Sequence, residues 1–334
     1  MGLAFAASTT QAQAPKEQTG LQLRSGGVEY RLARSGTEVR LEYFGPAGKA
    51  AWAKPRGLPV AGDLQGRIQN QPISAASMNL VAEVPRTLSP GVEELDLTYR
   101  HRTLPFELHA IYTAWGDTGV FTRRLVLINT GERALSVNSL ASLAWQLPPG
   151  AYRLDYLWGG WGQERQLHSE KLGPGARVFS SARGRSTELY SPWFALFNNT
   201  LGVGYAAQLA WSGNWSMSFE RAPGSGSSAI EDSPLNVVLR VQFDSDGALT
   251  LEPGVPFKLP EVAFTATALA PDPGDLDDLA NRLHRYQRQY VFAHHPANTP
   301  PLVQFNSWYP YQGKVHVDEL KRCADSAAAL GAEA

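Results

Sequence analysis

The stretch Glu94-Leu95-Asp96-Leu97-Thr98-Tyr99-Arg100 decides the fold, because apolar side chains at every second position alternate with polar ones. Successive side chains of a β-strand point to opposite faces, so this pattern predicts a strand with one apolar and one solvated face. Comparable apolar runs recur between residues 21 and 269, at 28–33, 38–44, 125–127, 135–143, 203–209, 237–243 and 262–269. The first three quarters of the chain are therefore predicted to be β.

Turn-forming residues separate these runs. Pro148-Pro149-Gly150, Asp244-Ser245-Asp246-Gly247 and Pro253-Gly254 are typical of tight connections between strands. About a dozen or more strands over about 250 residues favour one large antiparallel sandwich over two small ones. We therefore predict one large antiparallel β-sandwich domain at 21–270.

A helix is predicted after the sandwich. Asp272 can cap it, with Pro273 at the first helical position. Apolar residues then recur on one face, namely Leu276, Leu279, Leu283, Tyr286 and Tyr290. We predict a rigid linker helix followed by a Pro-rich link, at 271–299.

The pattern of residues 300–334 predicts one βα unit. The apolar run at 302–305 follows Pro300-Pro301 and suits a strand that is covered on both faces. From Val317, apolar residues recur at helical spacing until Gly331, where a helix would end. One βα unit cannot bury its own apolar face, so we predict the start of an incomplete barrel in a chain cut short.

Composition excludes some classes of protein. The 334 residues include 43% apolar and 18% charged residues, with a net charge of −1. The chain thus lacks the excess of Lys and Arg that would indicate nucleic acid or an anionic membrane as partner. Ala12-Gln13-Ala14 before Pro15 resembles a signal-peptide cleavage site, although the basic start is absent. Segment 1–20 is thus either a truncated secretory signal, which implies export to the periplasm or medium, or a disordered terminus, which implies a cytoplasmic protein.

The usual motifs of cofactor and metal sites are missing. Gly202-Val203-Gly204 lacks the third glycine of a dinucleotide loop, and the seven histidines show no metal-ligand spacing. We predict no cofactor and no metal. Pairs of carboxylates such as Glu93-Glu94 and Asp277-Asp278 are interpreted as solvated.

Tryptophan placement is the most informative local feature. Trp158 and Trp161 lie in a glycine-rich stretch, and Trp211 and Trp215 lie in a second stretch that contains glycine. Sugars present flat apolar C–H faces fringed with hydroxyls, which suit aromatic platforms beside planar hydrogen-bonding groups. Large aromatics in a sandwich are more often core, however, so each tryptophan taken singly is expected to be buried.

Several motifs together resemble the N-terminal domain of glycoside hydrolase family 36 α-galactosidases. They are Tyr112-Thr113-Ala114-Trp115-Gly116-Asp117-Thr118-Gly119, Asp155-Tyr156-Leu157-Trp158-Gly159-Gly160-Trp161-Gly162-Gln163-Glu164-Arg165, Ser212-Gly213-Asn214-Trp215 and Phe305-Asn306-Ser307-Trp308. The resemblance spans about residue 21 to the end. It implies a large β-supersandwich at 21–270, followed after the linker by the first βα unit of an incomplete (β/α)8 barrel at 300–334. It also implies a retaining enzyme that removes terminal α-linked galactose from oligosaccharides, with its two catalytic aspartates on later barrel strands. This chain is therefore expected to hold no catalytic carboxylate and to be inactive by itself.

The resemblance also implies substrate contacts in the complete enzyme. Trp308 matches a family tryptophan that walls the galactose pocket, at the carboxyl end of the first barrel strand, and Asn306 points the same way by strand alternation. Family members form homo-oligomers in which a sandwich loop reaches a neighbour's pocket. The stretch 52–70, with Asp63, is the candidate loop.

Two alternatives stay open at this point. A free-standing, non-catalytic carbohydrate-binding β-sandwich module would use the four tryptophans. A purely structural interaction domain would neither bind sugar nor hydrolyse it, but would form a defined oligomer.

Overall fold

The computed structural model describes residues 20–35, 37–49, 66–69, 71–73, 77–221, 234–242, 249–269, 275–292, 306–314 and 316–332. The chain forms two compact units, Met1–Tyr286 and Gln287–Ala334. Apart from Gly20, the segment predicted to be signal-like or disordered lies outside the described residues, as does the predicted helix cap at Asp272.

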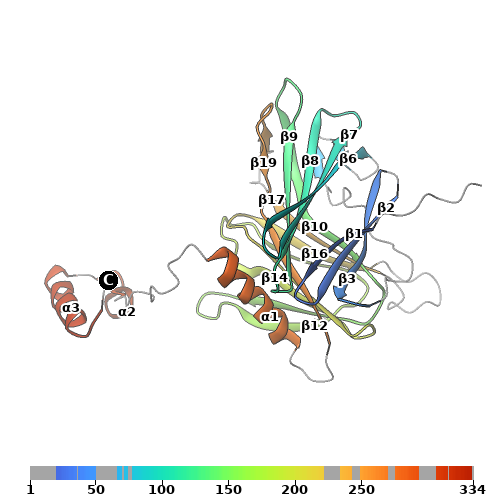
Figure 1. Cartoon of the computed structure of the whole chain (residues 1–334). Helices are drawn as coiled ribbons and strands as arrows, with labels where there is room; N and C mark the ends of the chain where they lie inside the picture. Colours follow the sequence, from blue (N-terminus) through green and yellow to red (C-terminus); the bar gives the residue numbers. More distant parts are fainter. Residues whose placement is uncertain are drawn as a thin grey trace, which may run out of the picture. The chain divides into compact units, whose positions relative to one another are not determined.

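Twenty strands of the first unit form three sheets (Figure 1). The three-stranded sheet has the order β1 (Gly20–Ser25), β2 (Val28–Ser35), β3 (Glu38–Pro46). The seven-stranded sheet has the order β13 (Gly175–Ser181), β16 (Trp215–Arg221), β17 (Leu235–Gln242), β10 (Leu135–Leu147), β4 (Gly66–Ile68), β5 (Gln71–Ile73), and β18 (Leu249–Leu251) also pairs with β10.

The ten-stranded sheet has the order β12 (Gln166–Lys171), β11 (Tyr152–Gly159), β14 (Leu189–Asn198), β15 (Val203–Leu209), β20 (Val262–Ala268), β9 (Val120–Asn129), β8 (Phe106–Trp115), β7 (Val92–His101), β6 (Met78–Ser89). β19 (Phe257–Lys258) pairs with β9. Every ladder between these strands is antiparallel, which confirms the predicted sheet type. β15 begins and ends at the predicted residues, and most other predicted runs fall within a strand.

One aromatic core joins the three sheets. Phe44 of β3 has no exposed surface, and its ring lies 5.2 Å from Trp145 of the seven-stranded sheet and 5.4 Å from Phe264 of the ten-stranded sheet. Tyr30 of β2 lies 5.5 Å from Phe44 and 5.3 Å from Phe264. Aromatic pairs at these distances add packing energy to the burial of apolar area, so the small sheet is an integral part of the sandwich.

Helix α1 (Asp275–Tyr286) covers β20 and β15 on the side opposite the aromatic core. Leu279, Leu283 and Tyr286 are buried, as the sequence spacing predicts. The Asp278 carboxylate accepts hydrogen bonds from Thr267 of β20 at 2.6 Å and from Arg282 at 2.8 Å. Burial raises the pKa of Asp278, but these hydrogen bonds outweigh it and the net pKa is lowered. The helix is thus fixed to the sandwich by both apolar and charged contacts.

The second unit has no core among its described residues. A π-helical turn (Gln287–Val291) is followed by α2 (Trp308–Tyr311) and α3 (Val317–Ala329). No described side chain from Gln287 onward is buried, and Val317 at the predicted apolar face of α3 is 66% exposed. α3 ends near Gly331, whose φ of +90° suits glycine, as predicted. The strand predicted at 302–305 lies outside the described residues.

Among the helices in the described part of the chain, none is both long enough and apolar enough to cross a bilayer.

Candidate functional site

The predicted substrate-binding residues lie in the second unit. Trp308 opens the one-turn helix α2 and is 60% exposed. Asn306 is exposed too, and its Oδ1 accepts a hydrogen bond from the Trp308 backbone N–H at 2.9 Å. Because Trp308 begins a helix instead of ending a strand, the alternation that placed both side chains on one face does not extend to them. Asp63 lies outside the described residues.

Two of the four tryptophans in the sandwich belong to its core. Trp215 is fully buried, and its Nε1 donates to the Ser186 carbonyl at 2.6 Å. Trp211 is partly buried against the core and donates to the Asn214 carbonyl at 3.0 Å. For these two, the expectation of burial is correct, and they do not offer a sugar platform.

The other two tryptophans are exposed. Trp158, next to the end of β11, is 41% exposed, and Trp161, in the following loop, is 95% exposed. Strand pairing places Gln166 of β12 and Tyr190 of β14 on either side of Trp158. The sequence alone could not find Gln166 and Tyr190 as neighbours of Trp158, because the register of β12 and β14 is not visible in the local pattern.

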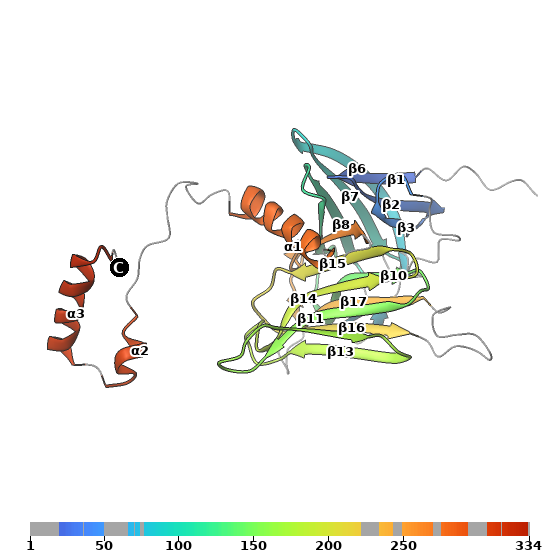
Figure 2. The same ribbon diagram turned by 90° about the horizontal axis from the view of Figure 1, so that it is seen from below.

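Three loops meet at this end of the sandwich, as the green and yellow hairpins of Figure 2 show. They are the β11–β12 loop at 160–165, the β13–β14 loop at 182–188 and the β15–β16 loop at 210–214. The side chain of Asn214 accepts a hydrogen bond from the Gly184 backbone N–H at 2.8 Å, which ties two of these loops together. We call this set the loop end of the sandwich.

A partly buried acid, Glu261, lies at the loop end, close to the end of α1. Glu261 precedes β20, its carbonyl accepts from Ala210 N at 2.9 Å, and its Oε1 accepts from the Tyr286 hydroxyl at 3.2 Å. Burial raises the pKa of Glu261, and hydrogen bonds from Thr122 and Tyr286 offset only part of that rise. Trp115 in turn donates to the Thr122 hydroxyl at 2.9 Å. No pattern in the sequence indicates this cluster.

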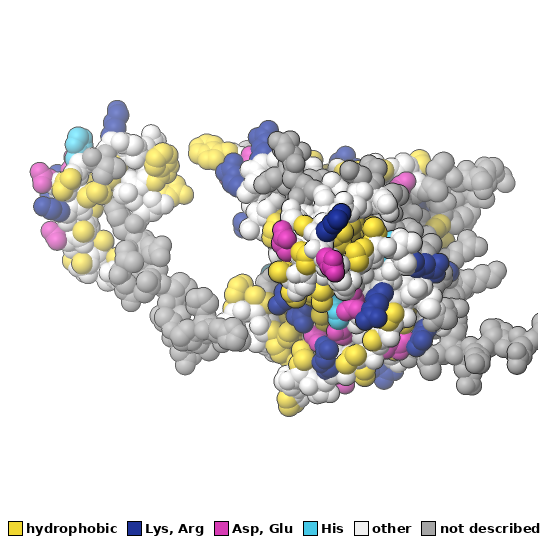
Figure 3. Space-filling view, turned by 90° about the horizontal axis from the view of Figure 1, so that it is seen from above, with side chains coloured by type: hydrophobic (Ala, Val, Ile, Leu, Met, Phe, Trp, Pro, Cys, Tyr) yellow, Lys and Arg dark blue, Asp and Glu magenta, His cyan; other side chains and the backbone are white. Residues whose placement is uncertain are grey.

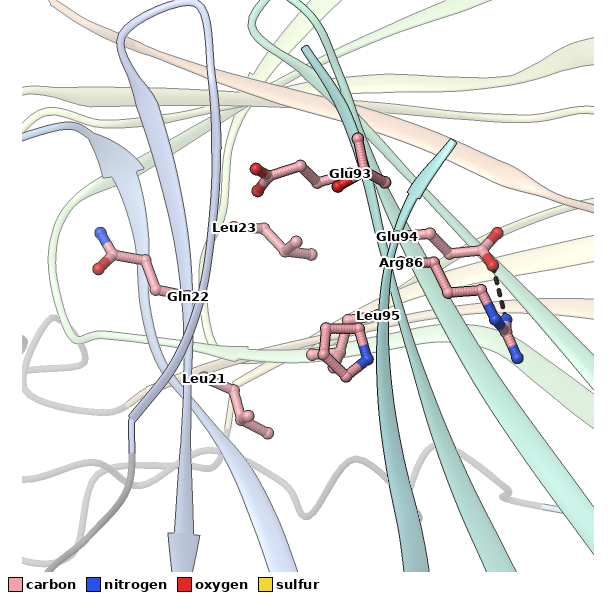
Figure 4. Close-up of a pocket in the computed structure, with 9 residues that line it drawn as sticks. Leu21, Gln22, Leu23, Arg86, Glu93, Glu94 and Leu95 are labelled. Atoms are coloured by element: carbon pink, nitrogen blue, oxygen red, sulfur yellow. Dashed lines mark hydrogen bonds and ion pairs between the residues drawn. The ribbon is translucent and has the colours of Figure 1, made fainter. Parts of the chain in front are cut away.

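A pocket of about 450 Å³ lies between β1 and the β6–β7 hairpin (Figure 4). Glu93 and Glu94 both line it, but Figure 4 shows them pointing away from each other, Glu93 toward β1 and Glu94 toward Arg86. Glu94 is 4% exposed and is held by Arg86 at 2.9 Å and Arg124 at 3.0 Å. The interpretation of Glu94 as solvated is therefore wrong, because guanidinium groups from β6 and β9 cover the polar face of β7.

These carboxylates do not form an acid/base pair, since Glu94 is neutralised by two arginines. Within the described residues, no group of three or more His, Cys, Asp or Glu side chains could hold a metal ion. In the view of Figure 3, basic and acidic side chains lie interspersed over the sandwich and do not gather into a field of one sign.

Comparison with known proteins defines the class first. The α-galactosidase AgaA of Geobacillus stearothermophilus shares the fold with a TM-score of 0.78 at 19% identity, over 94% of this chain and 49% of that chain. The galactosidase domain of AgaSK, an α-galactosidase–sucrose kinase, does so with a TM-score of 0.77 at 18% identity, over 93% of this chain and 48% of that chain. The chain therefore shares the mainly β fold of about half of each of these two α-galactosidase chains.

The family follows from the sequence. Residues 6–232 match the model of the glycosyl hydrolase family 36 N-terminal domain, and the chain belongs to this family. α-Galactosidase Mel36A of Lactobacillus acidophilus is 26% identical over 245 residues, which are 72% of this chain and 32% of that protein. The bifunctional α-galactosidase/sucrose kinase AgaSK of Mediterraneibacter gnavus is 25% identical over 72% of this chain and 24% of its own length. The chain thus spans a third or less of these curated relatives, and about half of the chains in the solved structures.

Proposed function

We propose that this chain is the N-terminal portion of a retaining α-galactosidase, which hydrolyses terminal α-linked galactose from oligosaccharides, and that the chain alone is inactive. Family membership supports the enzyme class, and the curated relatives named above are α-galactosidases. AgaA variants of Geobacillus stearothermophilus have been solved with raffinose and with stachyose, so α-galactoside oligosaccharides are the proposed substrates of the parent protein.

The lack of buried side chains among the described residues of the second unit is the observation that carries this proposal. An amphipathic helix such as α3 gains most of its stability by packing its apolar face, yet its described side chains are all at least partly exposed. A (β/α)8 barrel supplies seven further strands and helices to such a unit. This chain spans only part of the length of its relatives, which agrees with a barrel whose other strands and helices belong to the rest of the parent protein.

The chemistry requires groups that the described residues do not bring together. Retaining glycosidases hold two carboxyls about 5 to 5.5 Å apart, one as nucleophile and one as acid/base. The two glutamates of the pocket between β1 and the β6–β7 hairpin point apart, and one of them is paired with two arginines. We assign the catalytic pair to later barrel strands of the parent protein.

Residues of this chain have supporting roles in the proposal. Trp308 contacts substrate through its exposed indole, and Asn306 fixes the turn that presents it. Asp63 contributes to a neighbouring subunit in a homo-oligomer. The sandwich orients the barrel and stabilises the assembly.

The test compares two polypeptides. One is expressed from the reading frame that contains this chain and any coding sequence that follows it, and the other is residues 1–334 alone. We expect the longer polypeptide to release the aryl group from an aryl α-galactoside, and proton NMR to detect α-galactose as the first product. Residues 1–334 should release none. A longer polypeptide without α-galactosidase activity, or an inverted product, would contradict the proposal.

Trp308→Ala in the longer polypeptide tests the substrate contact. We expect kcat/KM for raffinose to fall about tenfold, which corresponds to about 1.4 kcal/mol of lost stabilisation. Leu201→Ala, at a residue 46% exposed in the sandwich between β14 and β15, is the control and should leave kcat/KM unchanged. Equal kcat/KM values for the two variants would show that Trp308 does not contact the substrate.

A further inference from the structure

The β11–β12 loop holds Trp161 in solvent by a set of short-range contacts. The Gly160 carbonyl accepts from Gln163 N at 3.0 Å, and Glu164 Oε1 accepts from Gly162 N at 3.0 Å. A Cβ at Gly159 would lie 1.8 Å from the Gln163 carbonyl oxygen, so the loop folds back onto the strand end more closely than any other residue type allows. These contacts hold the loop in a conformation that keeps the large indole of Trp161 exposed to solvent.

Trp158 is held equally firmly, three residues earlier. Its ring lies edge-to-face on His168 at 5.3 Å and near Tyr190 at 6.5 Å. Tyr190 is itself packed against the core ring of Phe179 at 4.9 Å. One edge of Trp158 is thus anchored while 41% of its surface is exposed. Its Cα lies no more than about 11 Å from that of Trp161, because only three residues separate them.

Planar polar groups surround the two indoles. Gln166, which is exposed, pairs directly with Trp158 across the β11–β12 ladder, so its amide lies on the same face as the ring. Glu164 is exposed, and hydrogen bonds from the backbone of Glu164 and Gly162 lower the pKa of its carboxyl, which keeps it an acceptor. Such groups offer both donors and acceptors to a ligand that rests on the rings.

We propose that Trp158, Trp161, Gln166 and Glu164 form a binding site for neutral oligosaccharides on the sandwich. The indoles stack on the apolar C–H faces of pyranose rings, and the amide and carboxylate bind hydroxyl groups. Protein docking is the weaker explanation, because the polar residues 163–166 interrupt the apolar surface that a protein partner would need to cover.

The position of this site suits a substrate-capturing role. The Tyr286 hydroxyl bonds to Glu261, and Glu261 bonds to Ala210 beside the β15–β16 loop, so α1 finishes at the loop end that carries both indoles. Oligosaccharide held here is held at the end of the sandwich from which the chain continues. Binding by residues 1–334 does not depend on the proposed function, because it requires no catalytic carboxylate.

The experiment is isothermal titration of residues 1–334 with raffinose and with stachyose. Trp161→Ala should weaken binding about tenfold, equivalent to about 1.4 kcal/mol, while Trp161→Phe, which keeps a ring, should recover part of the loss. Phe292→Ala, at a residue 54% exposed outside the sandwich, is the matched control and should bind like the unmodified chain. Because Trp161 is 95% exposed, its variants should keep the unfolding midpoint of the parent chain.

Three results would overturn the inference. The first is no detectable binding of either sugar by the unmodified chain. The second is binding that Trp161→Ala leaves unchanged. The third is an oligomer of the unmodified chain in sedimentation that Trp161→Ala dissociates without any sugar binding, since the loop would then be a protein contact. Activity of the parent enzyme with no binding at this loop would leave the proposed function intact and refute only the second site.

Discussion

Replacing Phe44 by alanine is the sharpest test of the shared aromatic core. The side chain has no exposed surface, and rings from Tyr30, Trp145, Tyr205 and Phe264 surround it at centroid distances between 5.2 and 5.5 Å. Phe→Ala in a core costs about 3 to 5 kcal/mol, which combines lost burial with the cavity left behind. We expect about 4 kcal/mol here, because rings held by three different sheets cannot move together to fill the gap.

Urea unfolding followed by tryptophan fluorescence and by circular dichroism measures this loss. Both probes should report one transition of the sandwich at a lower midpoint, since total stability of a domain is only about 5 to 15 kcal/mol. Phe292→Ala, at a half-exposed phenylalanine, is the control and should change stability by less than about 0.5 kcal/mol. A loss below about 1 kcal/mol for Phe44→Ala, or separate transitions for the two probes, would refute a single core that spans the three sheets.

Four further predictions concern other residues of the sandwich and of α1. Trp215→Ala should cost about 3 to 5 kcal/mol in urea unfolding, and a loss near zero would mean that this tryptophan is not core. Gly159→Ala should destabilise by about 1 to 3 kcal/mol and weaken raffinose binding, because the new methyl group collides with the Gln163 carbonyl; unchanged binding would show that the loop needs no tight turn. Burial raises the pKa of Glu261 in the folded chain, so its contribution to stability is present below its ordinary pKa of 4.5 and is lost as pH rises through the folded pKa. Glu261→Gln should therefore stabilise at pH 7 and lose this advantage near pH 4. The pKa of Asp278 is lowered, so Asp278→Asn should destabilise at pH 7 by about 1 kcal/mol, a deficit that shrinks as pH falls below its ordinary pKa of 3.8. Urea midpoints measured across pH distinguish these opposite signs, and equal pH profiles for both variants would contradict them.

The sandwich could be predicted from local pattern because strand alternation and turn residues are local properties. β7 illustrates both the success and the limit. Leu95, Leu97 and Tyr99 are buried as their alternation predicts, but Glu94 and Asp96 on the other face are buried as well. Alternation tells which residues share a face, whereas the arginines that cover the polar face come from β6 and β9, at positions that the sequence pattern does not connect to it.

The tryptophans show the same limit for the candidate site. Trp158 and Trp215 stand in similar glycine-containing stretches, yet one is 41% exposed and the other fully buried. The difference depends on which loop covers each ring, and only the fold supplies that information. Conversely, the helical spacing of residues 276–286 was sufficient to predict the buried face of α1, because helix periodicity needs no knowledge of partners.

The proposed function depends most on the observation that the described residues from Gln287 onward bury no core of their own. Hydrogen exchange of residues 1–334, followed by mass spectrometry, measures this directly. We expect the amides of α3 to exchange with opening free energies near zero, while those of β9 and β20 approach the global stability of the sandwich. Protection of α3 equal to that of β20 would show a self-sufficient folded element and would contradict the account.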